Sequence, residues 1–450
     1  MDVKEDMANG AMRWGGDVVR GMMLDGKRGV VALNMLLSGM ANGGALGEGG
    51  GMREGKRKAV EDIVKGVDWE VVKDKGSGRE IASINLKNCI WGLCHAGVTR
   101  GVLTSELGSR SASVVAGGNL QEVSNLLWCM GEGVKNNEEE DQEEMKRFEE
   151  AGIMLGSEIV SSGKGTSIVK SGRGEEISML FVALTRLSLP YPHLANMVMS
   201  DFDNVVERME PQGWSNVGHS MGIMGYPGGE WVDRVMGNEG RREEMMVKGT
   251  ASAYRSMLYA KAVGGWGEGV EREIWERAKG GEIGKGEYMQ LMIAKAVNAS
   301  EGGEVWEDDE RTLELGASYR SDFFHHRPSG MWSRRVFRAL DTLGFPYETE
   351  VCPFDERTVE EYGIWRELFA IDVANEERKI AIELDGPTHT LLGGQRNGTT
   401  KAKRRLLERL GWKVLTCGLE DSIELQERGM EEEVKWWREA LEDVGWRGDE

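Results

Sequence analysis

Long apolar runs are missing from this sequence of 450 residues. The best candidate, Val30 to Met40, is interrupted by Asn34, Ser38 and Gly39 and falls short of the ~18 residues that a bilayer-spanning helix needs. We therefore expect a soluble protein with no membrane partner. The hydrophobic fraction of 40% is nevertheless sufficient for buried cores, and the length allows two or more folded regions.

Cysteine is scarce, and its spacing excludes the usual structural uses. The residues form no Cys-x-x-Cys pair and have no companion histidines, so neither a zinc site nor a disulfide framework is indicated. They are Cys89, Cys94, Cys129, Cys352 and Cys417. We interpret them as ordinary buried thiols in a reducing compartment. No cofactor is predicted, except for Mg²⁺ if the chain is a nuclease.

An excess of basic residues is also missing. The chain has 56 Lys and Arg against 76 Asp and Glu, a formal net charge of −20. Proteins that hold phosphate over their whole surface are usually basic, so any contact with RNA must be local. The acidic residues concentrate in 136–150, in 304–311 and in the C-terminal tail, which are charge runs typical of solvated linkers.

The first residues do not have the composition of an organellar presequence. Such segments are rich in Arg and Ser and poor in acidic residues, whereas the chain begins with MDVKED. An organellar location is therefore not indicated by these residues and would have to follow from other features.

Segments with helical apolar spacing recur between residues 80 and 300. Each has a polar start, two or three large apolar residues and an end that usually contains glycine. Their equivalent positions follow one another at steps of 37, 54, 39, 38 and 35 residues: Trp91, Trp128, Val182, Met221, Tyr259 and Ala294. The one long step contains the acidic insertion 136–150. A period of about 38 residues predicts an α-helical repeat solenoid.

Stacked helical hairpins would bury their apolar stripes in one continuous core. The predicted core residues are Trp91, Leu93, Leu127, Trp128, Leu180, Leu184, Met221, Met224 and Leu258. Glycine is frequent inside these segments and costs ~1 kcal/mol relative to Ala in a helix interior, so the helices should be marginal without their neighbours. The alternative is an irregular helical domain in which common amphipathic patterning produces the similarity.

From about residue 330 the pattern predicts a small α/β domain. Gly344 ends a first helix, Pro353 ends an extended segment, and Thr399 is the expected N-cap of a second helix. The expected order is helix 334–343, strand 345–352, strand 367–373, strand 379–385, helix 399–410 and strand 412–417. The two central strands would form a hairpin with a turn at 374–378.

Three carboxylates are predicted to converge on one face of that hairpin. If Ala374 pairs with Lys379, Asp372 lies diagonal to Glu383, at roughly 7–8 Å, and Asp385 follows on the same face. Such carboxylates repel one another unless a divalent cation such as Mg²⁺ or basic side chains lie among them.

A catalytic use of these carboxylates would require a proton acceptor. His389, four residues after Asp385, is the candidate general base beside a metal ion bound by Asp372, Glu383 and Asp385.

Basic residues crowd the helix 399–410 and its flanks. Ala402, Leu406 and Leu410 are expected to pack inward, which leaves the cations on the remaining face. The candidate RNA-binding residues are Arg396, Lys401, Lys403, Arg404, Arg405, Arg409 and Lys413. The alternative is a solvated helix with one ion pair, between Arg404 and Glu408.

The C-terminal segment closely resembles the RAP domain. The hallmark pieces are Ile371-Asp372, Ala381 to His389, Asn397 to Thr399, Lys403 to Arg405 and Leu410 to Trp412. The resemblance implies a fold like that of very-short-patch-repair endonucleases of the PD-(D/E)XK class. In those enzymes the positions of Asp372 and Glu383 hold metal ligands, and the position of Asp385 commonly holds Lys.

The repeats resemble octotricopeptide repeats and, more loosely, the helical region of FAST kinase-like mitochondrial proteins. The expected organisation is a Gly-rich helical region over 1–79, the repeat array over 80–300, a linker over 301–329, the RAP domain over 330–425 and an acidic helix or tail over 426–450.

These resemblances imply an RNA-binding factor for post-transcriptional processing, stability or translation of organellar RNA. Its partners would be single-stranded RNA and other RNA-processing proteins, in a chloroplast or mitochondrion. A metal-dependent endoribonuclease and a protein–protein scaffold are the alternatives.

Overall fold

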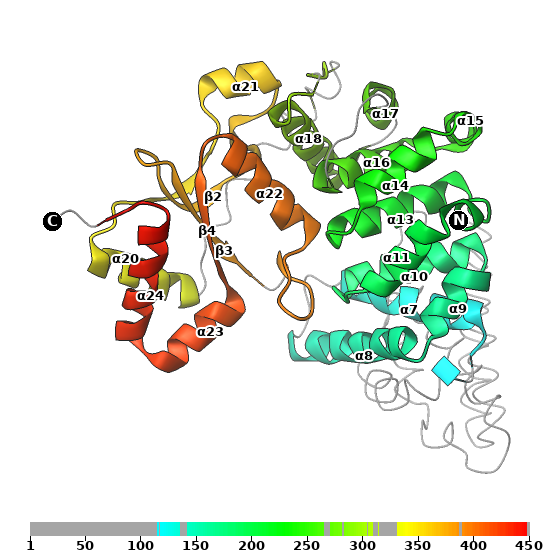
Figure 1. Cartoon of the computed structure of the whole chain (residues 1–450), viewed down its shortest axis with the longest axis horizontal. Helices are drawn as coiled ribbons and strands as arrows, with labels where there is room; N and C mark the ends of the chain where they lie inside the picture. Colours follow the sequence, from blue (N-terminus) through cyan, green and yellow to red (C-terminus); the bar gives the residue numbers. More distant parts are fainter. Residues whose placement is uncertain are drawn as a thin grey trace, which may run out of the picture. The chain divides into compact units, whose positions relative to one another are not determined.

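The computed structural model of the chain describes residues 115–116, 118–135, 142–264, 271–280, 283–303, 305–308, 314, 331–386 and 389–447. These residues are mostly helical, with a small four-stranded sheet near the C-terminus (Figure 1). The chain divides into two compact units, Met1–Met209 and Glu210–Glu450. Three of the sequence predictions fall outside the described residues: the region 1–79, Trp91 and Leu93. Among the described residues, no helix is long and apolar enough to cross a membrane.

In the first unit, the helices α7 and α10 pack against each other. Leu127 of α7 and Leu180 and Leu184 of α10 are fully buried, as predicted, whereas Trp128 is only half-buried. The described helices of this unit are α7 (Leu120–Lys135), α8 (Gln142–Ser161), α9 (Lys164–Ser171), α10 (Gly174–Arg186), α11 (Pro192–Ser200) and α12 (Phe202–Val206).

In the second unit, helix α16 is central and packs against α13, α14, α17 and α18. Met221 and Leu258 are fully buried and Met224 almost so, which confirms their predicted place in a core. The helices are α13 (Pro211–Ile223), α14 (Gly228–Met236), α15 (Glu239–Lys248), α16 (Ala251–Gly264), α17 (Glu271–Ala278) and α18 (Lys285–Ser300).

Two buried lysines mark equivalent places on α16 and α18. The sequence Ala-Lys-Ala-Val occurs in both helices, and its lysines, Lys261 and Lys295, are almost completely inaccessible. A buried ammonium group must be paired, because its desolvation is otherwise very costly. Lys261 pairs with Asp233, and Lys295 lies 2.7 Å from Asp308.

The start of the expected linker belongs to the helical fold. Trp306 is 3% exposed and its ring stacks on that of Trp275, with 5.0 Å between centroids. Because Asp308 also pairs with the buried Lys295, the description of 304–311 as a solvated charge run is wrong for these residues. The acidic composition hid a tryptophan that anchors the segment.

The C-terminal part contains a mixed sheet in the order β1-β2-β3-β4, with β1–β3 antiparallel and β4 parallel to β3. Its elements are α20 (Met331–Leu343), β1 (Glu348–Val351), α21 (Glu356–Tyr362), the short 3₁₀ helix Arg366–Leu368, β2 (Ile371–Asn375), β3 (Ile380–Asp385), α22 (Gly398–Arg409), β4 (Lys413–Gly418), α23 (Leu419–Arg428) and α24 (Met430–Asp443). The expected strand 367–373 therefore starts later, at Ile371, and α21 was not predicted.

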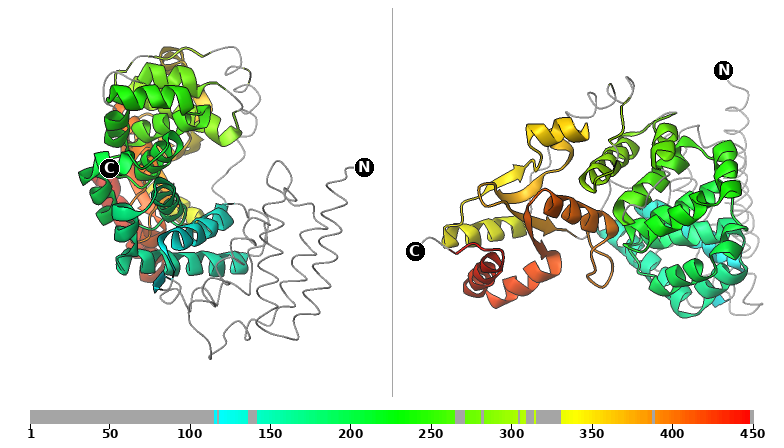
Figure 2. Two further views of the ribbon diagram at one scale, coloured as in Figure 1. Left: turned by 90° about the vertical axis from the view of Figure 1, so that its right-hand side faces the viewer. Right: turned by 45° about the horizontal axis from the view of Figure 1, so that its top comes forward.

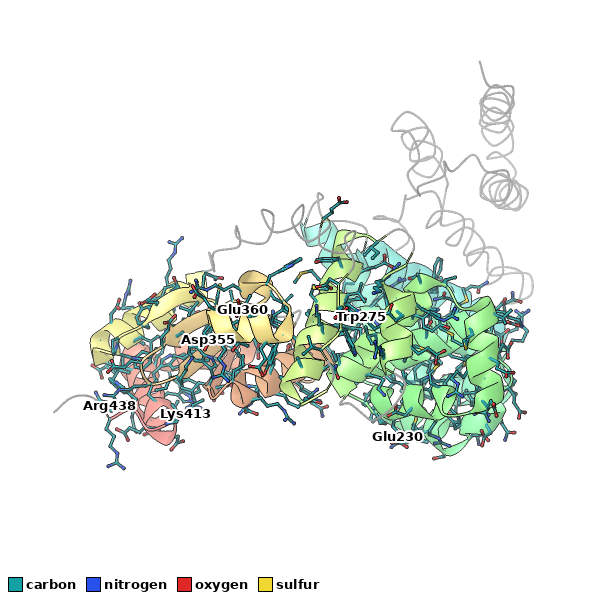
Figure 3. The ribbon with its side chains drawn as sticks, turned by 90° about the horizontal axis from the view of Figure 1, so that it is seen from above. Glu230, Trp275, Asp355, Glu360, Lys413 and Arg438 are labelled. Atoms are coloured by element: carbon teal, nitrogen blue, oxygen red, sulfur yellow. The ribbon has the colours of Figure 1, made fainter. Side chains whose placement is uncertain are left out.

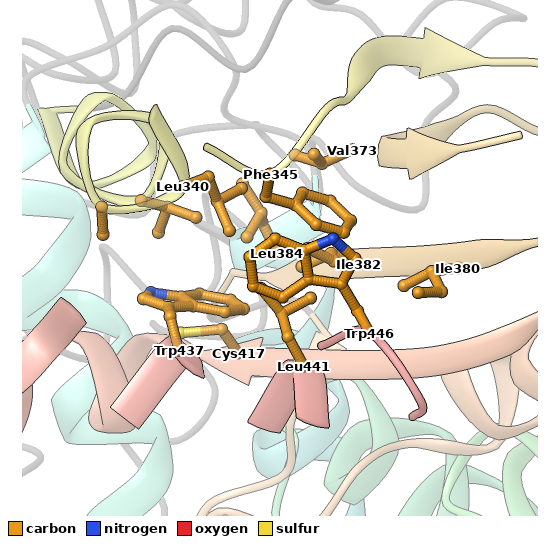
Figure 4. Close-up of a cluster of buried hydrophobic side chains, with 12 residues drawn as sticks. Leu340, Phe345, Val373, Ile380, Ile382, Leu384, Cys417, Trp437, Leu441 and Trp446 are labelled. Atoms are coloured by element: carbon orange, nitrogen blue, oxygen red, sulfur yellow. The ribbon is translucent and has the colours of Figure 1, made fainter. Parts of the chain in front are cut away.

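Alternation along β3 divides the core into two layers. Ile380, Ile382 and Leu384 pack with residues of α20 and α24 on one face (Figure 4), whereas Ala381 packs with Leu407 of α22 on the other. This alternation was predicted and follows from the period of two in a strand.

The acidic C-terminal segment is part of this core. Trp437 and Leu441 of α24 are fully buried beside Trp446, so the expectation of a solvated tail is wrong over these residues. The acidic side chains Glu431, Glu432 and Glu439 occupy the exposed face of an amphipathic helix.

Helix α22 lies between the sheet and the helices α13, α16 and α18 (Figures 1 and 2). Its N-cap is Asn397, which accepts a hydrogen bond from the Thr400 amide, and not the predicted Thr399. Ala402 and Leu406 are buried, as predicted, and Ala402 packs against Tyr259 and Val263 of α16.

The closest approach in this contact occurs at a glycine. A Cβ atom on Gly398, the first residue of α22, would lie 1.8 Å from the backbone oxygen of Gly222 in α13. Any side chain at position 398 would therefore displace α22 from α13.

We predict that Gly398→Ala lowers the free energy of unfolding by about 1–3 kcal/mol, because the clash is with backbone that cannot rotate away. Urea denaturation followed by tryptophan fluorescence measures this. The matched control is Gly286→Ala near the start of α18, where a Cβ meets nothing within 4 Å and a gain of up to about 1 kcal/mol is expected. Equal effects of the two variants would contradict this close packing.

Candidate functional site

The register of the central hairpin differs from the predicted one. Ala374 pairs with Ala381 and Asn375 with Ile380, so the assumed pairing of Ala374 with Lys379 is wrong. Continuing this register places Asp372 directly opposite Glu383. The shift is by two residues, and a shift by an even number leaves every side chain on its predicted face.

The turn explains this register. Its four residues are 376–379, and Asn375 closes it by accepting a hydrogen bond from the Arg378 amide at 2.9 Å. Lys379 adopts a positive φ of 51°, which reverses the chain before β3. An asparagine that bonds to backbone two or three residues later is a common turn former.

The three predicted carboxylates do lie on the face of the sheet that α22 covers. Asp372 accepts a hydrogen bond from the Leu384 amide at 2.6 Å. The side chains of Glu383 and Asp385 are only 8% and 2% exposed. Each of these groups therefore needs a partner within the protein.

Lys403 of α22 is the partner of Glu383. Its Nζ atom lies 2.5 Å from Glu383 Oε2 and 2.7 Å from the carbonyl oxygen of Ala370. Burial lowers the pKa of the Lys403 ammonium, but Glu383 and Asp372 outweigh this effect, so the pKa lies above its ordinary value. Lys403 is therefore a cation held among carboxylates.

Glu383 is only partly compensated by this lysine. Its second oxygen, Oε1, is buried and has no hydrogen-bond partner among the described residues. Burial raises the pKa of Glu383 to about 7; Lys403 opposes this rise and Asp372 adds to it. The pairing with Lys403 therefore offsets the burial of Glu383 only in part.

A fourth carboxylate, Glu350 of β1, was missed in the sequence. Burial raises its pKa, the charge of Asp372 adds to the rise, and Lys403 opposes it, so Glu350 belongs to the same electrostatic cluster. Its φ of 56° is unusual for a residue other than glycine. No motif spacing links β1 to the hairpin, and this backbone conformation left no sequence signal.

Asp385 holds two further basic groups. The Arg396 Nε atom donates to Oδ2 at 3.1 Å, and the His389 Nδ1 atom lies 3.4 Å from Oδ1. Burial raises the pKa of Asp385, and His389 and Arg396 partly offset the rise. The predicted base His389 is thus brought to the cluster, at its exposed edge.

Arg405 uses its guanidinium group within the fold. It donates to the carbonyl oxygens of Ala262 and Val263 at the end of α16 and lies 3.4 Å from Glu301. Carbonyl groups at a helix C-terminus are unsatisfied and partially negative, so a cation is favourable there. Arg405 joins α22 to the helical part of the unit.

The remaining predicted cations are more accessible. Lys401 is exposed, Arg404 pairs with Glu408 at 2.8 Å, and Arg409 is half exposed with Glu301 at 4.0 Å. Lys413 bonds the backbone of Val444 and lies, like Arg438, at the edge of the C-terminal part in Figure 3. The sequence left open a solvated helix with one ion pair, between Arg404 and Glu408. That ion pair is present, but it involves only one of these cations.

Carboxylates that lie close together need either a divalent cation or basic side chains among them. In this cluster, basic side chains lie among the carboxylates. Asp372 binds a backbone amide, Glu383 binds Lys403, and Asp385 binds Arg396. Within the described residues, no group of three or more His, Cys, Asp or Glu is arranged to hold a metal ion.

No protein-family model matches the chain.

We predict that Lys403→Met lowers the free energy of unfolding by about 3–5 kcal/mol at pH 8, because it leaves Glu383 buried and ionised without its partner. Urea denaturation at pH 8 and at pH 5 tests this, and the loss should shrink at pH 5, where Glu383 takes up a proton. Lys413→Met, at an exposed lysine, is the control and should cost roughly 0.5 kcal/mol or less. A loss independent of pH would contradict the pairing with Glu383.

The raised pKa of Glu383 has its own signature. A carboxyl group whose folded pKa exceeds its unfolded value of about 4.5 stabilises the fold below that value, and this contribution is lost as the pH rises to about 7. We predict that the difference in unfolding free energy, wild type minus Glu383→Gln, falls by roughly 3 kcal/mol across that window. A constant difference from pH 4 to pH 8 would sink the prediction.

Proposed function

We propose that the chain is an RNA-binding factor for post-transcriptional processing, stability or translation of organellar RNA. The resemblance of residues 330–425 to the RAP domain is the starting point. The observation that carries the proposal is the position of Lys403 and Arg396 among the carboxylates, since these cations leave the cluster compensated by the protein's own side chains. Because α22 covers this face of the sheet, the proposed RNA contacts lie on cations outside the carboxylate cluster.

The helical part would supply the surface along which single-stranded RNA lies. The aligned positions 128, 182, 221, 259 and 294 fall on α7, α10, α13, α16 and α18. Within each unit these helices pack on one another, α7 with α10 and α13 with α16 and α18. The matching buried lysines Lys261 and Lys295 also support a repeat solenoid of the octotricopeptide-like kind.

The C-terminal part is proposed to have a PD-(D/E)XK-like fold without depending on hydrolysis. Support comes from an antiparallel hairpin that carries the acidic residues and from a helix, α22, that connects β3 to the parallel strand β4. The RNA contacts would be made by the cations that the fold leaves accessible, Lys401, Arg404 and Arg409. A chloroplast or mitochondrial location is proposed from the family resemblance alone.

Labelled single-stranded RNA, incubated with the full chain in the presence of Mg²⁺, tests this proposal. We expect salt-sensitive binding without cleavage. The triple variant Lys401→Gln, Arg404→Gln and Arg409→Gln should bind more weakly and with a shallower dependence on salt, while the triple variant Arg428→Gln, Lys435→Gln and Arg438→Gln, at exposed cations of α23 and α24, serves as the control.

Two outcomes would overturn the proposal. Cleavage that disappears in Glu383→Gln, which keeps the shape of the side chain, would make the chain a ribonuclease. Absence of RNA affinity at low salt would favour the protein–protein scaffold.

A further inference from the structure

The edge of the carboxylate cluster contains two basic groups fixed by one buried acid. The Asp385 side chain is 2% exposed, and its two oxygens face different partners, Arg396 Nε at 3.1 Å and His389 Nδ1 at 3.4 Å. Because a buried carboxylate has few alternative partners, it fixes the orientation of both groups.

Each of these side chains has nitrogen atoms that Asp385 does not engage. Asp385 engages Nε of the Arg396 guanidinium and Nδ1 of the His389 ring, and Thr400 Oγ1 lies 3.4 Å from the same Nδ1 atom. Among the described residues, no partner is found for the Arg396 Nη groups or for His389 Nε2. The side chains are 34% and 46% exposed. The Nη groups of Arg396 and the Nε2 atom of His389 therefore remain accessible to a ligand.

The backbone between these two residues is held in place. The His389 carbonyl accepts a hydrogen bond from the Asn397 amide at 3.0 Å, and Thr390 and Arg396 form an antiparallel bridge. Thr400 of α22 also contacts His389, with its Oγ1 atom 3.4 Å from Nδ1. The two donors are thus positioned before any ligand arrives, which reduces the entropy cost of binding.

The donor set indicates the ligand. The Arg396 guanidinium offers its Nη–H groups to an anion with two adjacent oxygens, and the non-bridging oxygens of a phosphodiester have this geometry. Because Nδ1–H of His389 donates to Asp385, its Nε2 atom adds a further N–H donor in the imidazolium form of the ring. The partial positive charge of the α22 N-terminus, one residue beyond Asn397, adds to the attraction.

We propose that His389 and Arg396, fixed by Asp385, form a binding site for one backbone phosphodiester of RNA. This inference rests on the proposed RNA-binding function and assigns His389 to phosphate contact and not to acid–base catalysis. The site lies at the start of α22, so a bound strand would run past the accessible cations Lys401 and Arg404.

Fluorescence anisotropy with a single-stranded RNA oligonucleotide and the full chain tests the site. The double variant His389→Ala, Arg396→Lys keeps a cation beside Asp385 and removes the imidazole ring and the planar guanidinium fork. We expect about tenfold weaker binding at low salt and a plot of log Kd against log salt that is shallower by roughly 0.7 for each lost contact. Thermal unfolding of the variant verifies that it is folded at the temperature of the binding assay, and Arg438→Gln, an exposed cation of α24, serves as the control.

The results distinguish a failure of the proposed phosphate site from a failure of the proposed RNA-binding function. If wild type binds RNA and the double variant binds it equally well with the same salt dependence, the site is wrong while the proposed function stands. If wild type binds no RNA, both are wrong. A 5′-phosphorylated oligonucleotide should bind no better than its 5′-hydroxyl counterpart; a clear preference for the phosphorylated one would overturn the phosphodiester assignment in favour of a terminal phosphate.

Discussion

The pairing of Lys403 with Glu383 is the constraint on which the C-terminal half of the chain depends. Four acidic side chains, of Glu350, Asp372, Glu383 and Asp385, approach one face of the sheet, and Glu383 is almost completely removed from water. Such a cluster is stable only with a cation inside it. The cation comes from α22, so this helix must cross the sheet where its lysine reaches Glu383. The rest of the arrangement follows from that position.

One helix then has to satisfy two surfaces. Residues two apart on an α-helix project about 200° apart, so Lys403 and Arg405 point to opposite sides of α22. Lys403 compensates the sheet carboxylates, and Arg405 binds the carbonyl groups at the end of α16. The contact is close enough that only a glycine fits at position 398. Two of the cations in the predicted basic segment, Lys403 and Arg405, are thus used within the fold, whereas Lys401, Arg404 and Arg409 stay accessible.

From the sequence it was possible to predict which side chains share a face of the sheet, but not which residues from other elements contact them. Alternation along β3 and the even difference between the expected and observed registers kept Asp372, Glu383 and Asp385 together, although the assumed turn was wrong. Local patterns also located the helix that carries Lys403. Long-range facts had no such signal: Glu350 comes from another strand in an unusual backbone conformation, and the burial of Trp437 was hidden by the acidic residues around it. The acidic composition of this segment reflects the exposed face of an amphipathic helix and does not reveal the apolar residues on its buried face.

The surroundings of position 385 explain why an acidic side chain fits there. A lysine at this position would place a cation on β3 itself. Here the cation reaches Glu383 from α22, and a second lysine at position 385 would face His389 and Arg396 with like charge. An aspartate instead attracts both groups and orients them toward solvent. Lys403 thus compensates Glu383 from α22, while Asp385 holds Arg396 and His389 at the edge where we propose that a phosphate binds.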